Sequence, residues 1–406
     1  MAKTIWFIND YAGSSHHGME FRNYYFAREL VKQGYEVYII TASYMHLFKK
    51  LPQVHKNYTF EKIDGINYLW IKVPKYGEST NKKRVLKWFV FTIKLFFLPL
   101  KKMKKPDIVI ASPMAPFLAL PAYRLAKMFN AKFIYEVKDI WPLSIIELGG
   151  FSPSHPLIRL MSYCERFALK KADHIVSSLQ NYDGHMKSLG IDRTFTWVNN
   201  GIDLEEMKEI EPLSKEIEDK IPKDKFIIGY AGTVGIANAL DSLCKVSKLL
   251  KEYKDIMIVI VGDGQEKENL QKEFSQNENI LFIDAIPKKQ VHSMLAYFDA
   301  CYIGLREEAL FKYGVSPNKL FDYMYSATPI IYAIDSGENN VVKSGECGVS
   351  IDAENPKAIY RAVLDIYNLN KNERREMGNR GRAYVLEHFT YSKLALKISK
   401  IWGKNE

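Results

Sequence analysis

Cysteine is scarce in this sequence, and so is any long apolar run. The 406 residues hold four cysteines, at positions 164, 244, 301 and 347, which are too far apart for a C-x-x-C or zinc-binding pattern. We expect buried thiols in a reducing compartment and no disulfide framework. The most apolar run, Trp88–Leu100, is interrupted by Lys94 and is too short to span a bilayer. The amino terminus lacks the pattern of a signal peptide, so we expect a cytoplasmic protein.

Acidic residues are missing from one strongly basic segment. The formal net charge is +10, from 57 Lys and Arg against 47 Asp and Glu. Residues 81–105 hold nine of the basic residues and no acidic one, so the rest of the chain carries only 10 − 9 = +1. A diffuse nucleic-acid surface is therefore not indicated. Low-complexity tracts are missing too, and the 47% hydrophobic content is typical of globular domains.

Short β-branched and aromatic runs alternate with amphipathic stretches, which predicts two α/β domains with parallel sheets. A polar stretch at 199–225 is typical of an interdomain linker. Such sheets bind ligands at the carboxyl ends of their strands. The expected strands are 4–8, 36–41, 67–73, 107–111, 132–137, 174–177, 195–198, 226–231, 256–261, 280–283, 300–303, 329–332 and 349–351. The expected helices include 20–33, 241–253, 265–276, 289–297, 318–325 and 391–402.

Glycines follow the first two expected strands of the second domain. They occur in Gly229-Tyr-Ala-Gly-Thr-Val-Gly235 and in Val261-Gly-Asp-Gly264. Glycine lets the backbone approach a phosphate closely, and a following helix offers free N–H groups. Neither run matches G-x-G-x-x-G, and no P-loop lysine follows. Each run alone is explained by a strand-to-helix turn, whereas the two together favour a nucleotide diphosphate.

A lysine and an aspartate stand one helical turn apart in residues 312–324. Ser316 or Asn318, with Pro317 between them, fits a helix start. Lys319 then lies in the first turn, where a cation is unfavourable unless an anion shares the site. Asp322 offers acceptor oxygens for ribose hydroxyls. The alternative is a solvent-exposed Lys–Asp pair on the helix surface.

The order of several motifs resembles the retaining glycosyltransferases of family 4. Ser316-Pro-Asn-Lys-Leu-Phe-Asp-Tyr-Met324, followed by Ala327-Thr-Pro-Ile-Ile331, is similar to the donor-binding helix of that family. Glu136-Val-Lys-Asp-Ile-Trp-Pro142 and Gly18-x-x-x-Arg22 most resemble bacterial N-acetyl-L-fucosamine transferases of surface-polysaccharide synthesis. The resemblance covers nearly the whole chain. The other motifs, in order, are Lys171-Ala-Asp-His-Ile-Val176, Asn200-Gly-Ile-Asp203, the Gly232 turn, Val261–Gly264 and Asp299.

The resemblance implies the GT-B fold, in which two Rossmann-like domains with parallel sheets face each other across a cleft. Residues 1–205 would bind the acceptor, 206–385 the donor, and 386–406 would form a helix that crosses back to the first domain. It also implies a UDP-sugar donor, no cofactor and no obligatory metal. The implied donor-binding residues are Gly232, Thr233, Gly262, Gly264, Ile286, Ser316, Asn318, Lys319 and Asp322. The implied catalytic residues are Asp139, His17 and Lys319, which position substrates and stabilise the leaving diphosphate.

Two departures from the family pattern concern the donor. The family commonly has two glutamates separated by seven residues, but here the second is Asp322 and the first position holds Gly314. The basic residues that usually follow the Gly232 turn are missing from 233–238. Lys319, together with Arg306, would then have to neutralise the diphosphate.

The first domain offers candidate acceptor residues in and after the loop that follows its first strand. By resemblance these are His16, His17, Gly18 and Arg22. A solvated histidine pair is the alternative for the first two. Asp139, at the carboxyl end of a strand, is placed to orient or deprotonate the acceptor hydroxyl, unless it only caps the next helix.

The basic segment 81–105 predicts contact with an anionic membrane surface. A helix there places Lys87, Lys94 and Lys101 on one stripe beside broad apolar surface, and Pro99 kinks or ends it. The alternatives are a core helix whose lysines extend outwards and, more weakly, a nucleic-acid groove.

These features predict a retaining glycosyltransferase, peripheral on the inner face of the cell membrane. It would move a sugar, by resemblance an N-acetylated deoxyhexosamine, from UDP to a lipid-linked saccharide in capsule, O-antigen or exopolysaccharide synthesis. One alternative is a nucleotide-sugar 2-epimerase on the same fold, although no carboxylate pair stands at suitable spacing. The other is a non-catalytic sugar-nucleotide-binding partner, which Gly314 keeps open.

Overall fold

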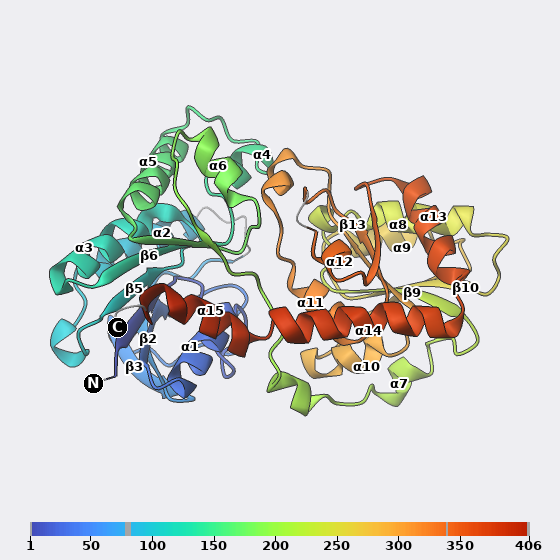
Figure 1. Ribbon diagram of the computed structural model, residues 1–406, viewed down its shortest axis with the longest axis horizontal. Coiled ribbons are helices and arrows are strands. Elements are labelled where there is room, and N and C mark those ends of the chain that lie inside the picture. The colour runs from blue at the N-terminus through green and yellow to red at the C-terminus, as the bar shows by residue number, and fades with distance from the viewer. Residues whose placement is uncertain (1, 78–82, 338–339, 404–406) are drawn as a thin grey trace. The chain divides into compact units, whose positions relative to one another are not determined.

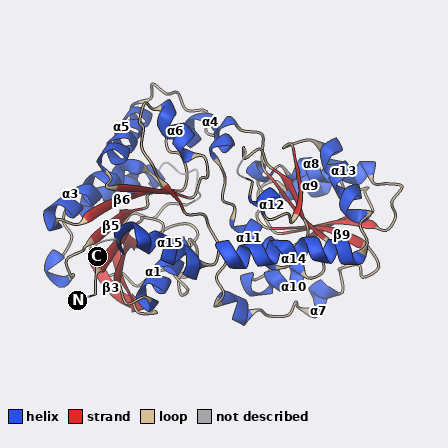
Figure 2. Ribbon diagram, viewed as in Figure 1, coloured by secondary structure: helices blue, strands red, loops and turns tan. Residues whose placement is uncertain are grey.

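The chain divides into two compact units, each with its own sheet. The computed structural model describes residues 2–77, 83–337 and 340–403. Unit 1 comprises residues 1–199 and 391–406, and unit 2 comprises residues 200–390 (Figure 1). The divisions thus lie at 199/200 and 390/391, where the sequence predicts 205/206 and 385/386. The predicted α/β class is confirmed, since parallel strands and helices alternate in both units (Figure 2).

Unit 1 is built on an eight-stranded sheet with the order β3-β4-β2-β1-β5-β6-β7-β8. Its central strands are buried throughout, as expected for strands covered on both faces. The strands are β1 (Thr4–Ile8), β2 (Glu36–Ala42), β3 (Tyr58–Ile63), β4 (Ile66–Ile71), β5 (Ile108–Ala111), β6 (Lys132–Val137), β7 (His174–Ser177) and β8 (Thr196–Trp197). The helices are α1 (Arg22–Lys32), α2 (Lys83–Leu95), α3 (Ala119–Phe129), α4 (Leu143–Glu147), α5 (Pro156–Lys171), α6 (Tyr182–Ser188) and α15 (Tyr391–Gly403).

The helices of unit 1 lie on opposite faces of its sheet. The connection from β1 to β2 and the connection from β4 to β5 run in opposite directions along the strand order. Because parallel crossovers are right-handed, α1 covers one face, and α2, α3 and α5 cover the other (Figure 1). The last helix, α15, joins α1, with the rings of Tyr25 and Tyr391 4.7 Å apart. Residues 404–406 of the predicted returning helix lie outside the described residues.

Strand β3 is absent from the sequence-based prediction. It pairs antiparallel with β4, so this sheet is mixed rather than wholly parallel. Asp64 and Gly65 connect the two strands, both with positive φ (50° and 81°). An Asp-Gly pair between two strands is a strong hairpin signal, so the sequence did carry the information.

Unit 2 has a six-stranded parallel sheet with the order β11-β10-β9-β12-β13-β14. The strands are β9 (Phe226–Ala231), β10 (Ile256–Val261), β11 (Ile280–Ile283), β12 (Ala300–Gly304), β13 (Ile330–Ala333) and β14 (Gly348–Ile351). The helices are α7 (Lys215–Glu218), α8 (Leu240–Leu249), α9 (Lys267–Glu273), α10 (Val291–Leu295), α11 (Asn318–Tyr325), α12 (Val341–Ser344), α13 (Pro356–Tyr367) and α14 (Lys371–His388).

The predicted linker at 199–225 is almost wholly part of unit 2. Two of its acidic residues contact residues that flank α10, one in the turn before this helix and one just after it. Glu206 pairs with Lys288 at 2.6 Å, and Tyr297 donates to Glu218 at 2.7 Å. The charge-rich composition therefore reflects ion pairs along one edge of unit 2 and not a free tether.

Two glycines let α14 lie directly against α11. A Cβ added at Gly378 would lie 1.8 Å from the carbonyl oxygen of Ala327, and one at Gly381 would lie 2.7 Å from Cβ of Cys347. The contact matters for function because α11 carries Lys319.

We expect Gly378→Ala to lower the free energy of unfolding of unit 2 by about 1–3 kcal/mol, because the added methyl group overpacks the contact between α11 and α14. This outweighs the helix propensity of alanine, which favours the substitution by about 1 kcal/mol. Asn379→Ala is the matched control, since this side chain is exposed one residue further along α14. Native-state hydrogen exchange of unit 2 amides provides the measurement. Equal stability of the two variants would contradict the packing argument.

Candidate active site

Two glycine turns meet at the carboxyl edge of the sheet of unit 2. A Cβ added at Gly262 would lie 1.9 Å from the carbonyl oxygen of Gly232, and one at Gly264 would lie 2.3 Å from that of Val234. The amide of Gly232 donates to Val261 O at 2.9 Å. Glycine is therefore required because one turn packs on the other. The turn after β9 lies where the strand order reverses, which is the usual ligand site of such sheets.

Lys319 extends from the first turn of α11 over the Gly232 turn. Its Nζ donates to Tyr230 Oη at 2.5 Å and to Asn238 Oδ1 at 2.9 Å. A Cβ added at Gly232 would lie 3.0 Å from this Nζ. Burial lowers the pKa of Lys319 to about 7. Among the residues that the structure describes, no carboxylate lies within ion-pair distance, so this half-buried cation has only neutral partners.

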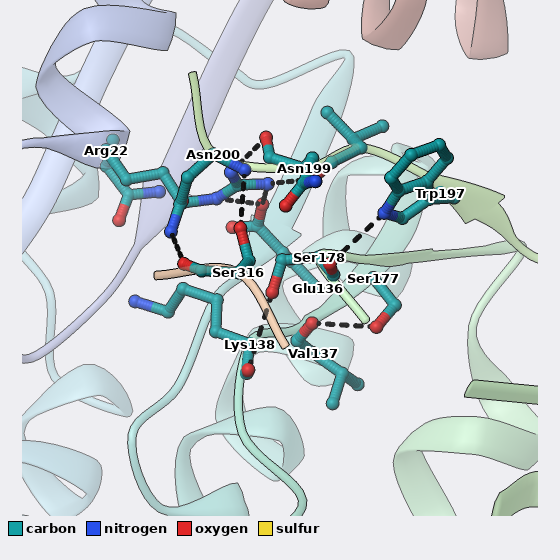
Figure 3. Close-up of polar contacts among 12 residues, drawn as sticks. Arg22, Glu136, Val137, Lys138, Ser177, Ser178, Trp197, Asn199, Asn200 and Ser316 are labelled. Atoms are coloured by element: carbon teal, nitrogen blue, oxygen red, sulfur yellow. Dashed lines mark hydrogen bonds and ion pairs between the residues drawn. The ribbon is translucent and has the colours of Figure 1, made fainter. Parts of the chain in front are cut away.

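The amino end of α11 differs from the prediction. The helix begins at Asn318, Pro317 occupies the N-cap position, and no side chain caps the first turn. The predicted start at Asn318 is therefore confirmed, but without a side-chain cap. Ser316 contacts Asn200 instead. Its Oγ accepts a hydrogen bond from the backbone N–H of Asn200 at 2.9 Å, and its carbonyl oxygen accepts one from Nδ2 of Asn200 at 2.6 Å (Figure 3). The uncapped first turn presents the positive end of a helix beside Lys319.

Asp322 does not pair with Lys319. Its Oδ1 lies 3.2 Å from Nε2 of His292 on α10, so the alternative of a surface Lys–Asp pair is excluded. The carboxylate is partly exposed. His292 was missed from the sequence because it is 30 residues away and belongs to no motif.

Arg306 is already neutralised within unit 2. Its guanidinium lies 2.5 Å from Glu354 Oε1 and 3.1 Å from Asp241 Oδ1. The prediction that it helps to neutralise a diphosphate is therefore wrong. Of the remaining predicted donor residues, Thr233, Gly264 and Asn318 are exposed and Ile286 is half-buried.

In unit 1, Arg22 is a buried structural residue. Only 2% exposed, it donates through Nε and Nη2 to Glu136 Oε1 at 3.0 and 2.8 Å (Figure 3). It also donates to the carbonyl oxygens of Val198 and Asn199, both at 2.7 Å. Burial alone would raise the pKa of Glu136, but Arg22 and Lys138 hold it below its usual range. Arg22 therefore ties α1 to β6 and to the segment after β8, a structural role that the sequence did not predict, and its acceptor-binding role stays a prediction.

The loop after β1 is closed by residues that were predicted to contact the acceptor. His17 is buried, with Nδ1 2.7 Å from Ser14 Oγ and its ring 4.8 Å from that of Trp70. Burial lowers the pKa of His17 and favours the neutral ring. Gly18 pairs with Ser14 and Phe48. His17 and Gly18 are thus held inside the loop, and their predicted roles toward the acceptor stay predictions.

His16, in contrast, is exposed in the same loop. It is the histidine of the predicted pair that an acceptor can reach.

Asp139 stands exposed after the carboxyl end of β6. It does not cap a helix, because α4 begins at Leu143 with Pro142 in the N-cap position. Desolvation by the surrounding protein raises the pKa of Asp139. The positive charge of Lys138 lowers this pKa, and the negative charge of Glu20 raises it. Lys138 itself pairs with Glu20 at 3.0 Å. Glu20 was missed because nothing in the sequence links two residues 118 positions apart.

The basic segment forms α2, but not with the predicted stripe. Lys87 is fully buried, and its Nζ lies 3.2 Å from Asp10 Oδ2. Lys94 is half-buried and donates to Asn57 Oδ1 at 2.9 Å. The stripe of Lys87, Lys94 and Lys101 as a membrane contact is therefore wrong. The helix ends at Leu95, ahead of Pro99, and residues 81–82 lie outside the described residues.

Each unit of the chain matches a known glycosyltransferase family. The profile described as “Glycosyltransferase Family 4” matches residues 16–206, and that described as “Glycosyl transferases group 1” matches residues 214–384. Two tandem parallel-sheet units with these matches define a GT-B glycosyltransferase. The chain thus belongs among the GT-B enzymes related to family 4.

Relatives and solved structures agree with this placement. “Probable glycosyltransferase WbjE” of Pseudomonas aeruginosa is 22% identical over 72% of this chain and 73% of that protein. “Putative colanic acid biosynthesis glycosyl transferase WcaI” of Escherichia coli is 23% identical over 64% and 67%. The fold is shared with sucrose-phosphate synthase of Thermosynechococcus elongatus (TM-score 0.73, 15% identity, 99% and 98% covered). It is also shared with HepE of Anabaena, solved with UDP (TM-score 0.67, 11% identity, 99% and 100% covered).

None of the helices in the described part of the chain has the length and apolarity needed to cross a membrane.

We expect Arg22→Ala to lower the free energy of unfolding of unit 1 by about 3–5 kcal/mol, because it leaves the Glu136 carboxylate buried without its partner. All six tryptophans belong to unit 1, so urea unfolding followed by tryptophan fluorescence reports on this unit alone. The control is Arg159→Ala, at an exposed position of α5, with an expected change within about 0.5 kcal/mol. A stable Arg22→Ala variant that loses acceptor affinity would support the acceptor role instead.

Proposed function

We propose that this glycosyltransferase is a retaining enzyme that moves a sugar from UDP to a lipid-linked saccharide. It acts in bacterial surface-polysaccharide synthesis, at the cytoplasmic face of the membrane and in contact with an anionic membrane surface. The observation that carries the proposal is Lys319, a half-buried cation with neutral partners, beside an uncapped helix end and two interlocked glycine turns.

The donor diphosphate fits this arrangement chemically. An anion beside Lys319 supplies the missing countercharge and accepts hydrogen bonds from the first turn of α11. Asp322, held by His292, is placed one turn later to accept from ribose hydroxyls. The structure of HepE with UDP supports a uridine nucleotide as the donor. Following the resemblance, we take the sugar to be an N-acetylated deoxyhexosamine.

The acceptor is assigned to unit 1 through Asp139 and His16. In the proposed step, the bond from the anomeric carbon to UDP breaks while a bond to the acceptor oxygen forms on the same face of the sugar. Asp139 orients the acceptor hydroxyl, whose proton passes to the leaving diphosphate. Protonated Lys319 stabilises the charge that develops there, so positioning and electrostatics supply the catalysis without an obligatory metal.

The absence of the family's first glutamate has a local backbone reason. Gly314 has φ of +102°, a conformation that a glutamate would adopt only with strain. The position is therefore specialised in this chain, and the proposal assigns no role to a side chain there. The name of WcaI, a putative colanic acid biosynthesis glycosyl transferase, supports a saccharide acceptor of a surface polysaccharide.

We expect UDP affinity to weaken as pH rises above about 7, the pKa to which burial lowers Lys319. Above this pH the free protein holds Lys319 neutral, and binding of the diphosphate must bring in a proton. Between pH 7.5 and 9 the Kd for UDP should therefore rise by up to about tenfold per unit, with close to one proton taken up per UDP bound. Calorimetry in buffers of different ionisation enthalpy measures both quantities.

Lys319→Arg is the control for this titration, because a guanidinium stays protonated throughout the range. Its Kd for UDP should vary little with pH. A wild-type Kd that is constant from pH 7.5 to 9, without proton uptake, would show that Lys319 does not bind the diphosphate.

Asp139→Asn should lower acceptor-dependent UDP release by about a hundredfold or more, because the amide orients the hydroxyl poorly. UDP binding should stay unchanged, since Asp139 belongs to unit 1. Unaltered turnover would remove Asp139 from the mechanism. Conversion of the nucleotide sugar without any acceptor would instead favour an epimerase.

A further inference from the structure

Helix α2 has two faces of different character. Lys87, Trp88, Phe91 and Leu95 are buried in unit 1, whereas the opposite side of the helix is open to solvent.

The buried face holds the loop that follows β1. Lys87 Nζ donates to the carbonyl oxygen of Asp10 at 2.7 Å, pairs with Asp10 Oδ2 at 3.2 Å and lies 3.4 Å from the ring centre of Tyr11. Arg84 donates from Nε to the hydroxyl of Tyr11 at 2.8 Å. This loop leads directly to His16.

The same face also contacts the segment that carries Asp139. The ring of Trp88 meets that of Trp141 edge to face, with the centres 5.6 Å apart. Trp141 lies two residues after Asp139. One helix therefore contacts both segments that we assign to the acceptor.

The exposed face of α2 is apolar to an unusual degree. We call the set Leu86, Ile93, Phe96 and Phe97 the α2 face. Ile93 is 55% and Phe97 is 70% exposed. Leu86 and Ile93, seven residues apart, share one side of α2, and Phe96 and Phe97 lie in the turn that follows its last residue, Leu95. Phe96, 41% exposed, lies under the guanidinium of Arg124 from α3. Such apolar groups close together on a surface indicate a contact with another apolar phase.

Basic residues border the α2 face at both ends. Lys83 precedes it, and Lys101, Lys102 and Lys105 follow it, all exposed. Lys104 is also exposed but pairs with Glu36. No acidic residue occurs from 81 to 105. An apolar centre with a basic border complements an anionic lipid surface, whereas a protein partner would need acidic groups of matching pattern.

We propose that the α2 face docks on an anionic bilayer, and that the docked helix fixes the two acceptor segments through Lys87 and Trp88. Membrane contact and acceptor positioning are then one event, so that the site is ordered where a lipid-linked saccharide arrives. The coupling rests on the proposed function, whereas the docking itself does not. It also replaces the lysine stripe expected from the sequence with apolar side chains, of which Leu86 and Ile93 each precede a stripe lysine by one residue.

The docking test compares vesicles of phosphatidylglycerol with vesicles of phosphatidylcholine in sedimentation. The intact chain should bind the anionic vesicles, and Ile93→Glu/Phe97→Glu should bind them at least tenfold more weakly. The matched control is Leu396→Glu on α15, equally exposed at 52% but on the opposite face of the sheet, and it should bind almost as the wild type does. Equal binding by both variants, or equal binding to both vesicle types, would overturn the docking surface.

The coupling test uses hydrogen exchange of residues 9–18 and 138–142. Phosphatidylglycerol vesicles should slow exchange of both segments in the wild type, and leave the double variant unchanged. Vesicle binding without slower exchange would overturn the coupling.

Activity on a soluble saccharide acceptor separates this inference from the proposed function. The double variant should keep wild-type turnover there, since the α2 face lies outside the assigned substrate contacts. Loss of that turnover would show that the α2 face serves the substrate site directly and would overturn the docking role. A wild type that docks and shows the slowed exchange, but transfers no sugar, would leave the docking in place and overturn the proposed function.

Discussion

The structure depends most on how three interior cations are neutralised. Arg22 and Lys87 in unit 1 each meet a carboxylate, Glu136 and Asp10 respectively, within hydrogen-bonding or ion-pair distance. Lys319 in unit 2 meets only a phenol and an amide oxygen. Since removing a charge from water is costly without a partner, the first two are structural ion pairs, and for the third we propose an anionic ligand.

That contrast is built from backbone packing. The glycine turns after β9 and β10 interlock so closely that no side chain fits between them, which leaves space only for Lys319. The glycines of α14 let α11 pack closely against α14. The amino end of α11, which no side chain caps, then lies beside Lys319. In unit 1 the equivalent rigidity comes from side chains. Arg22 joins three segments, and α2 contacts the two loops that lead to His16 and Asp139.

The sequence predicted the parallel strands well, because buried parallel strands are short runs of β-branched and aromatic residues. It missed β3, whose residues are only partly buried and carry no clear periodicity. Glycine turns and Lys319 were identifiable because local spacing determines them. The burial of Arg22, His17 and Lys87 was not predicted, because charge and titratability describe a side chain but not its burial. Their partners Glu136, Ser14, Trp70 and Asp10 are brought to them by the fold, and in most cases from far along the chain. Arg306 was misjudged for the same reason.

The unneutralised charge of Lys319 is the central claim, and its titration tests that claim most directly. In protein labelled at the lysine side chains, the NMR signal of Lys319, assigned through Lys319→Arg, should titrate with a pKa of about 7. Saturating UDP should move this pKa upwards by about two units or more, because the diphosphate favours the charged form. A value near the ordinary lysine pKa of about 10.4, unchanged by UDP, would contradict the account.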